Sequence, residues 1–145
     1  MKILFVLLFP LPIFAVSFEV IGPCSDKPIY QVNEAVHAQN LGDLTESLLK
    51  HSGLPFEGDR TGIKSIDHSP TGDKAIEVLS DIKMRAYGWC VEVDGKQPET
   101  MPDQVPLEPS AKKVKWFYAF SLYESGNWTQ YCTPSYTIKA KQICP

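Results

Sequence analysis

The sequence has 145 residues, of which 43% are hydrophobic and 21% are charged, and its formal net charge at neutral pH is -3. This length suits one domain, and the chain contains no internal repeat and no low-complexity linker. The mild negative charge argues against nucleic acid or an anionic membrane as the main partner.

The start of the chain predicts export. A lysine at position 2 precedes an uncharged apolar run over 3–16, and the small residues Ala15 and Ser17 close it. This pattern predicts a secretory signal peptide over 1–17, cut after Ser17. The run is too short to be a membrane anchor, which needs roughly 20 apolar residues. We therefore expect a secreted or periplasmic protein with a single domain over 18–145 and no integral membrane segment after cleavage.

The first half of that domain predicts strands around one main helix. A short strand at 18–21 and a weaker one at 29–36 flank a turn, which favours a hairpin. Leu44, Leu48 and Leu49 then lie on one face of a helix over 43–52. Asp43 and Glu46 have the spacing of a capping box at its start, and Gly53 ends it. A loop over 58–62 leads into a short strand at 63–66.

The second half predicts a two-turn helix and then mostly strands. Ala75, Ile76 and Leu79 fall on one helical face, which predicts the helix over 73–80. The remaining expected elements are, in order, a strand at 84–93, a tight turn at Asp94-Gly95, a proline-rich surface loop over 97–110, strands at 114–123 and 128–132, and an extended tail over 136–144. This order predicts a small α+β domain with a mixed or antiparallel sheet.

The four cysteines are Cys24, Cys90, Cys132 and Cys144. An even number in a small exported domain predicts two disulfides, with three possible connectivities. No close pair of the kind that binds zinc occurs. If residues 125–127 turn a hairpin, Cys132 folds back beside the strand neighbouring that of Cys90. This favours Cys90–Cys132, and Cys24–Cys144 then ties the two ends of the chain together.

The order of motifs from residue 40 to 120 resembles the C-terminal domain of transcobalamin and intrinsic factor, a pattern shared by exported bacterial domains of unknown function. The motifs are the helix at 43–52, GIKSI at 62–66, YGWCVEVDGK at 87–96 and VKWFYAF at 114–120. The resemblance implies a β-grasp-like fold and a role in binding. Asp94 stands where the family has Asn, and Ala111-Lys112-Lys113 replaces its Gly-Asp. Cobalamin binding is not implied.

Four aromatic residues are the candidate ligand-binding residues. If the strands at 84–93 and 114–123 pair, then Trp89, Trp116, Tyr118 and Trp128 would floor an apolar cleft, which is the usual form of a ligand site. The alternative is that these side chains form the core of the sheet. Trp128 stands beside a turn and is the one most expected to be exposed.

Other chemistry has weaker support. Cys90 with His37, His51 or His68 would make a nucleophile and a base, but a disulfide accounts better for Cys90. The histidines have no metal-binding spacing, and no G-x-S-x-G or H-E-x-x-H motif occurs. Asn127-Trp128-Thr129 matches a glycan acceptor sequence for a eukaryotic source.

These observations predict a non-catalytic exported module, without a cofactor, that binds a small molecule or an extracytoplasmic protein or peptide. A structural surface component without a ligand and a small hydrolase of unrecognised type are the alternatives.

Overall fold

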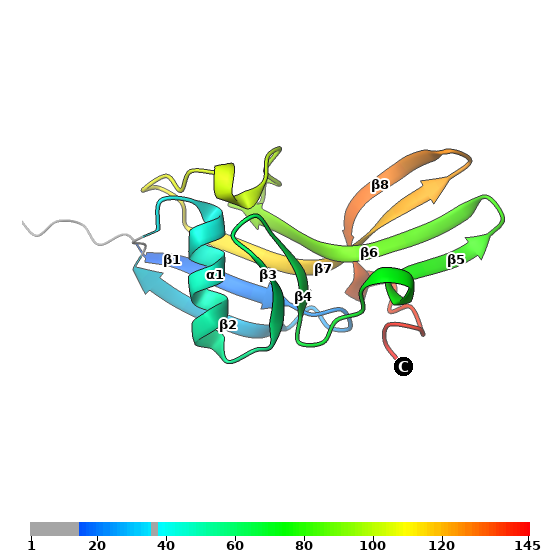
Figure 1. Ribbon diagram of the computed structural model, residues 1–145, viewed down its shortest axis with the longest axis horizontal. Helices are drawn as coiled ribbons and strands as arrows, with labels where there is room; N and C mark the ends of the chain where they lie inside the picture. Colours follow the sequence, from blue (N-terminus) through cyan, green and yellow to red (C-terminus); the bar gives the residue numbers. More distant parts are fainter. Residues whose placement is uncertain (1–14, 36–37) are drawn as a thin grey trace, which may run out of the picture.

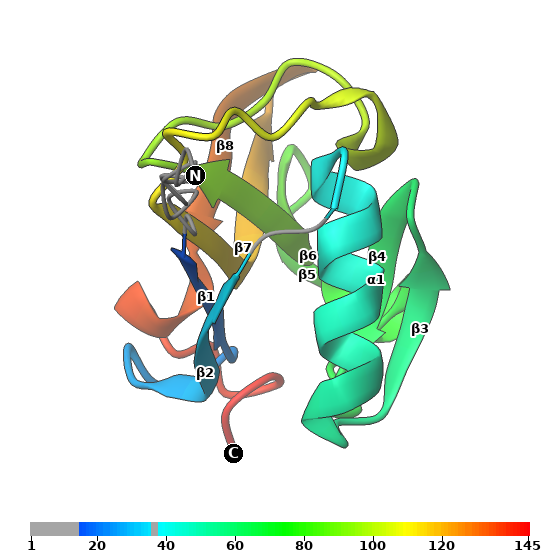
Figure 2. The ribbon, with the colours of Figure 1, turned by 90° about the vertical axis from the view of Figure 1, so that its left-hand side faces the viewer.

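The computed structural model describes residues 15–35 and 38–145 of the chain. They form one small domain in which a curled, mixed sheet wraps around one helix (Figures 1 and 2). The strands of this sheet are β1 (Ala15–Ile21), β2 (Pro28–Ala35), β5 (Ile76–Ser80), β6 (Lys83–Val93), β7 (Lys113–Glu124) and β8 (Asn127–Pro134). The helix is α1 (Leu41–Ser52), and the strands β3 (Phe56–Asp59) and β4 (Gly62–Ile66) form a separate hairpin.

The long strand β7 organises the sheet. One edge of β7 pairs antiparallel with β6 along its whole length, from Lys83 opposite Glu124 to Val93 opposite Val114. The other edge is shared, because β1 pairs with the first half of β7 in parallel and β8 pairs with the second half antiparallel. The strand order is β2-β1-β7-β6-β5, and β8 lies off this path. The expected mixed sheet with one main helix is therefore confirmed, while the β-grasp part of the expectation stays a prediction.

The main core lies between the sheet and α1. The helix buries Leu41, Leu44, Leu48 and Leu49 against the inner face of the sheet. There Trp116 of β7 donates its indole N–H to the Thr45 hydroxyl at 2.9 Å. A polar contact between two buried side chains fixes the helix at one position along β7, which apolar packing alone would specify less sharply.

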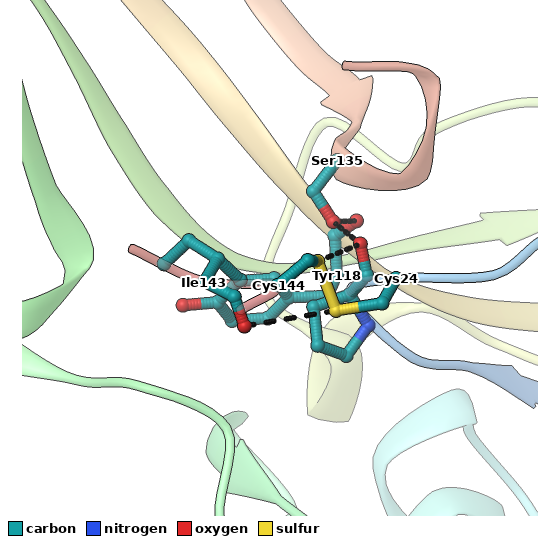
Figure 3. Close-up of a disulfide and its surroundings, with 6 residues drawn as sticks. Cys24, Tyr118, Ser135, Ile143 and Cys144 are labelled. Carbon is teal, nitrogen blue, oxygen red and sulfur yellow. Dashed lines mark hydrogen bonds between the residues drawn. A yellow bond between two sulfur atoms is a disulfide. The ribbon is translucent and has the colours of Figure 1, made fainter. Parts of the chain in front are cut away.

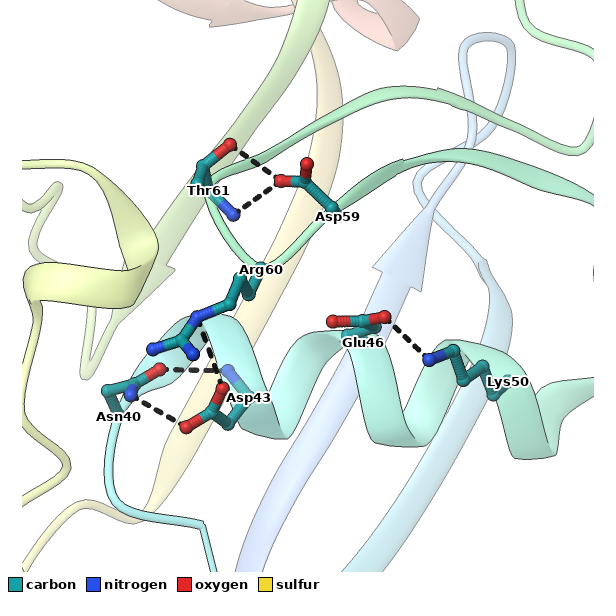
Figure 4. Close-up of polar contacts among 7 residues, drawn as sticks. All are labelled: Asn40, Asp43, Glu46, Lys50, Asp59, Arg60 and Thr61. Atoms are coloured by element: carbon teal, nitrogen blue, oxygen red, sulfur yellow. Dashed lines mark hydrogen bonds and ion pairs between the residues drawn. The ribbon is translucent and has the colours of Figure 1, made fainter.

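The start of α1 differs from the expected one. The N-cap is Asn40, whose side chain accepts a hydrogen bond from the Asp43 N–H at 2.8 Å and donates to its carboxylate at 2.7 Å (Figure 4). Glu46, expected in the capping box, instead pairs with Lys50 one turn on. Arg60 of the β3–β4 turn reaches Asp43, so the hairpin is attached to the first turn of the helix.

Three further expectations were wrong in whole or in part. Residues 73–80 form a short 3-10 helix (Gly72–Ala75) followed by β5, because Ile76–Ser80 pairs with β6 instead of continuing a helix. The tail over 136–144 is built from turns, with a 3-10 helix at Ser135–Thr137, rather than an extended strand. The last two residues of β3, Gly58 and Asp59, were expected in the loop over 58–62 but pair with Ile63 and Gly62 of β4.

The tight turn at Asp94-Gly95 is confirmed, with φ of 50° and 78° at the two residues. The Asp94 carboxylate accepts hydrogen bonds from the backbone N–H groups of Lys112 and Lys113, at 3.1 Å and 2.9 Å. The Asp94 carboxylate therefore fixes the backbone at the start of β7. Asp94 is one of the positions at which the sequence departs from the transcobalamin-like pattern.

The ends of the described chain are joined by the disulfide Cys24–Cys144 (Figure 3). Each of its sulfurs lies 3.6 Å from a carbonyl oxygen, but a disulfide sulfur has no hydrogen to donate, so these are packing contacts. The polar link beside it is Ser135, which is buried and lies 2.8 Å from the Pro23 oxygen and 3.0 Å from the Tyr118 oxygen. The turn after β1, the middle of β7 and the tail thus meet at one point.

The predicted signal peptide lies outside the described residues except for positions 15–17, which begin β1. A cut after Ser17 would remove Val16, which is fully buried in the main core. The position of the cut stays a prediction.

Candidate functional site

The structure does not bring the four predicted aromatic residues into one cleft. Trp116 and Tyr118 are 2% and 0% exposed and lie in the core on the inner face of the sheet. Trp89 is partly buried on the same face, and its indole N–H donates to the Ser69 hydroxyl at 2.8 Å. Trp128, on β8, is 41% exposed.

Burial also affects the hydroxyl of Tyr118. Its O–H donates to the Pro70 carbonyl at 2.7 Å, and desolvation raises its pKa to about 12. The hydroxyl is therefore protonated at neutral pH and serves as a structural donor. These contacts assign three of the four aromatic residues to folding and leave Trp128 as the one available for binding.

The strand that carries Trp128 bends over the outer face of the sheet. Its pairing with β7 shifts register twice, between Phe120 and Leu122 and between Leu122 and Tyr123. At each shift one extra residue of β8 enters the pairing, and such bulges bend a strand and increase its twist. Figure 1 shows β8 and the second half of β7 as a hairpin that rises above β5 and β6 in this view. The disulfide Cys90–Cys132 fixes this bend by joining β6 to β8 across β7.

The bend leaves a cleft of about 340 Å³ between β8 and the outer face of β6 and β7. It is lined by Ala86, Tyr87, Gly88, Trp89 and Cys90 of β6, by Ala119, Phe120 and Ser121 of β7, and by Trp128 and Tyr131 of β8. Tyr87, Trp89 and Phe120 pack their side chains into the inner cores, so β6 and β7 present mainly small side chains to the cleft. The floor of the cleft is therefore formed by small side chains of β6 and β7, and its one aromatic wall by Trp128 and Tyr131 of β8.

The aromatic wall is exposed and held in place. Tyr131 is 66% exposed, and its O–H approaches the Trp128 carbonyl at 3.4 Å. The Trp128 ring packs edge-on against Tyr123 of β7, with 5.3 Å between the ring centroids. A glycine at position 88 of the floor keeps the cleft open, since a Cβ there would meet no atom within 4 Å. Tyr131, Gly88 and Ser121 are site residues that the sequence reasoning missed.

The cleft carries no charge among the described residues that line it. On the opposite face of β5 and β6, Glu77 accepts hydrogen bonds from Arg85 at 2.9 Å and from Tyr87 at 2.6 Å. Burial alone would raise the pKa of Glu77, but these two hydrogen bonds and the Arg85 charge together lower it. Further along the face that carries the cleft, Glu92 of β6 and Lys115 of β7 form an ion pair at 2.6 Å.

A larger groove of about 450 Å³ lies between α1 and β2. It is lined by Tyr30, Glu34, Ala38, Asp43, Leu44, Ser47, Leu48 and His51. We prefer the β8 cleft as the site for two reasons. Polar groups of the groove are already used within the fold, because Asp43 binds Asn40 and Arg60 and the His51 ring binds the Ser47 carbonyl. Two residues of its lining, Glu34 and Ala38, also lie close in sequence to residues 36–37, which are outside the described residues.

Over residues 15–35 and 38–145, no group of three or more His, Cys, Asp or Glu side chains is placed to hold a metal ion. Cys90 is in a disulfide, which removes the thiol that a nucleophile would need. No helix in the described part of the chain is long and apolar enough to cross a membrane.

No family model matches the chain, and no curated protein matches it in sequence. Among solved structures it is similar to a "putative metal binding protein" from Ruminococcus gnavus ATCC 29149, with 19% sequence identity and a TM-score of 0.49. That likeness covers 72% of this chain and 94% of the other. The resemblance to the transcobalamin C-terminal domain therefore stays a prediction.

Proposed function

We propose that this protein is an exported, non-catalytic binding module, and that the cleft between β8 and the outer face of β6 and β7 holds an uncharged apolar group of its ligand. The observation that carries the proposal is the pairing of a small-residue floor with an exposed aromatic wall formed by Trp128 and Tyr131. Sheet faces left to solvent usually carry polar side chains, so an uncharged, hollowed patch on such a face favours contact with a partner.

The size of the cleft supports a ring or a branched apolar side chain as the bound group. Ligand pockets usually measure about 300–1,000 Å³, and this cleft of about 340 Å³ is at the small end. Burying apolar surface contributes about 25 cal/mol per Å² before the costs of association are subtracted. A single ring in a small open cleft therefore binds weakly, and useful affinity requires contacts beyond it.

The two disulfides support an extracytoplasmic location, because such bonds form and persist mainly in oxidising compartments. A non-catalytic role is proposed because the residues lining the cleft supply no general base, metal ligand or free nucleophile. A structural component without a ligand is the alternative, and the experiment below separates the two.

The test uses N-phenyl-1-naphthylamine, an uncharged aromatic probe that fluoresces when it leaves water. We expect saturable binding to the wild-type protein and loss of at least tenfold in affinity for Gly88→Leu, whose side chain would fill the cleft. Gly62→Leu is the matched control, because its added Cβ also meets open space but lies on the β3–β4 hairpin. Equal binding by all three proteins would place the probe elsewhere, and no saturable binding would favour the structural alternative.

A further inference from the structure

The strand β8, which forms one wall of the cleft, has a free edge. Its other edge pairs with β7, and no further strand in the part of the chain that the structure describes pairs with it. Every residue from Asn127 to Tyr131 is exposed, so this stretch of the edge is open to solvent. Backbone N–H and C=O groups along such an edge bond to water or to an added strand.

This edge lacks the side chains that usually prevent pairing with another chain. Edge strands are commonly protected by charged residues or by proline. The strand β2, at one end of the main sheet, begins with Pro28 and contains Glu34, and β5, at the other end, contains Glu77. The exposed stretch of β8 reads NWTQY and contains neither a charge nor a proline. By this criterion it is the least protected of the three edges.

The open edge is short and coincides with the cleft. Its extended conformation ends at Cys132, where φ is 48°, and Pro134 has no N–H to offer. The bulges in the pairing with β7 also limit how long a partner strand can be. The stretch that remains, over 127–131, is the part of β8 that carries Trp128 and Tyr131 of the cleft wall. Backbone edge and cleft therefore belong to the same few residues.

A strand added to this edge would use both features. Its backbone would bond to β8, and because side chains alternate between two faces, every second one would lie on the side of the cleft. In such strand addition, main-chain bonds supply affinity and pockets for alternate side chains supply specificity. The lining of the cleft is uncharged, which selects an apolar side chain. Resting on the binding function proposed above, we infer that the ligand is an extended segment of a partner protein that pairs with β8 and places an aromatic or β-branched side chain in the cleft.

A second copy of this chain fits the role less well. Pairing between two β8 strands would bring up Trp128 and Tyr131 of the other copy, but these rings already form the wall of that copy's own cleft. No free apolar side chain would then be delivered to the cleft. A separate segment with an alternating pattern supplies both the backbone and the missing side chain.

The test titrates the complete disulfide-bonded protein with three acetylated, amidated hexamers. The first alternates threonine and valine, the second has serine in place of each valine, and the third keeps the Thr-Val side chains but has ester oxygens in place of its internal amide N–H groups. We expect the Thr-Val hexamer to bind, to displace N-phenyl-1-naphthylamine and to slow amide hydrogen exchange over 127–131. The other two should bind roughly tenfold more weakly or worse, because one lacks the apolar side chains and the other lacks the backbone donors.

Two variants test the same contacts from the side of the protein. Gly88→Leu fills the cleft, so it should weaken binding of the Thr-Val hexamer to the level of the Thr-Ser hexamer. Gly62→Leu, on the β3–β4 hairpin, should leave the affinity unchanged.

The outcomes separate this inference from the function on which it rests. Probe binding that no hexamer displaces, or equal affinity for the Thr-Val hexamer and its ester analogue, would overturn the inference and leave the cleft as a site for a small apolar group. If neither probe nor hexamer binds, the inference and the proposed function are both wrong. Self-association that light scattering detects and Gly88→Leu prevents would identify the occupant as a second copy, which also overturns the inference.

Discussion

Cys90 and Cys132 are bonded to each other although β7 lies between their strands, with 5.9 Å between their Cα atoms. Strands that flank a common neighbour in a flat sheet are about 9.5 Å apart, twice the usual interstrand spacing. The short distance therefore requires β8 to fold over the outer face of β7. The same fold creates the cleft, so this disulfide links the stability of the domain to the shape of its site.

Removing each disulfide in turn should separate these two effects. The loops closed by Cys24–Cys144 and Cys90–Cys132 span 120 and 42 residues. The chain-entropy model gives stabilisations of about 5 and about 4 kcal/mol for loops of these lengths. We expect Cys24→Ala/Cys144→Ala to lose at least as much stability in urea unfolding but to keep probe binding. Cys90→Ala/Cys132→Ala should lose probe binding under conditions where it is still folded. Retained binding in the second variant would show that the disulfide does not shape the cleft.

The tryptophans should differ sharply in what they contribute to stability. Trp116 is buried and bonded to Thr45, so Trp116→Ala should lower the free energy of unfolding by about 3–5 kcal/mol. Trp128 is exposed and makes an edge contact with Tyr123, so Trp128→Ala should cost about 1 kcal/mol or less. Denaturant unfolding measures both values. Similar losses for the two variants would contradict the division into core and site.

Gly42 should be needed for close packing rather than for its backbone conformation. A Cβ at this position would lie 2.0 Å from the backbone oxygen of Arg60, where α1 meets the β3–β4 turn. We expect Gly42→Ala to lower the free energy of unfolding by about 2–3 kcal/mol, because backbone must move to admit the methyl group. Gly62→Ala, which meets open space, should change it by about 0.5 kcal/mol or less. A thermal melt in which both variants match wild type would rule out the close approach.

The interaction of Glu77 with Arg85 and Tyr87 should make stability sensitive to acid. Because the folded-state pKa of Glu77 lies below its ordinary value of 4.5, its ionised form is favoured by folding. That stabilisation is present above the unfolded pKa and is lost as pH falls through the folded one. Urea unfolding at pH 7 and pH 3 should show a smaller loss in acid for Glu77→Gln than for wild type. An equal loss would mean that other carboxyl groups account for the acid sensitivity.

The strongest strands could be predicted from the sequence because their pattern is local. The side chains over 84–93 and 114–123 alternate between two faces, and this period of two predicts a strand in each range. The structure has β6 and β7 there. The segment 73–80 could not be assigned this way. Ala75, Ile76 and Leu79 have helical spacing, yet only Ala75 is buried, and pairing with β6 makes the rest a strand.

The site was only partly predictable for a related reason. Aromatic content drew attention to β6, β7 and β8, but it did not distinguish the inner face of the sheet from the outer one. The available signal in the sequence was the small side chains that alternate with Tyr87 and Trp89. Ala86 and Gly88 have little or no side chain to fill the space above the outer face of β6, which leaves room for the cleft. The bend of β8 depends on bulges whose positions are set by pairing with β7, and no local pattern specifies them.

The most direct test of the proposed binding site is an NMR titration that follows the indole N–H signals of the three tryptophans. Each signal would be assigned with a single Trp→Phe variant, and N-phenyl-1-naphthylamine would be added to the folded, disulfide-bonded protein. We predict the largest shift at Trp128, which lines the cleft, and no shift at Trp116, which is buried with Thr45. Saturable binding that shifts Trp116 and leaves Trp128 unchanged would contradict the proposed site.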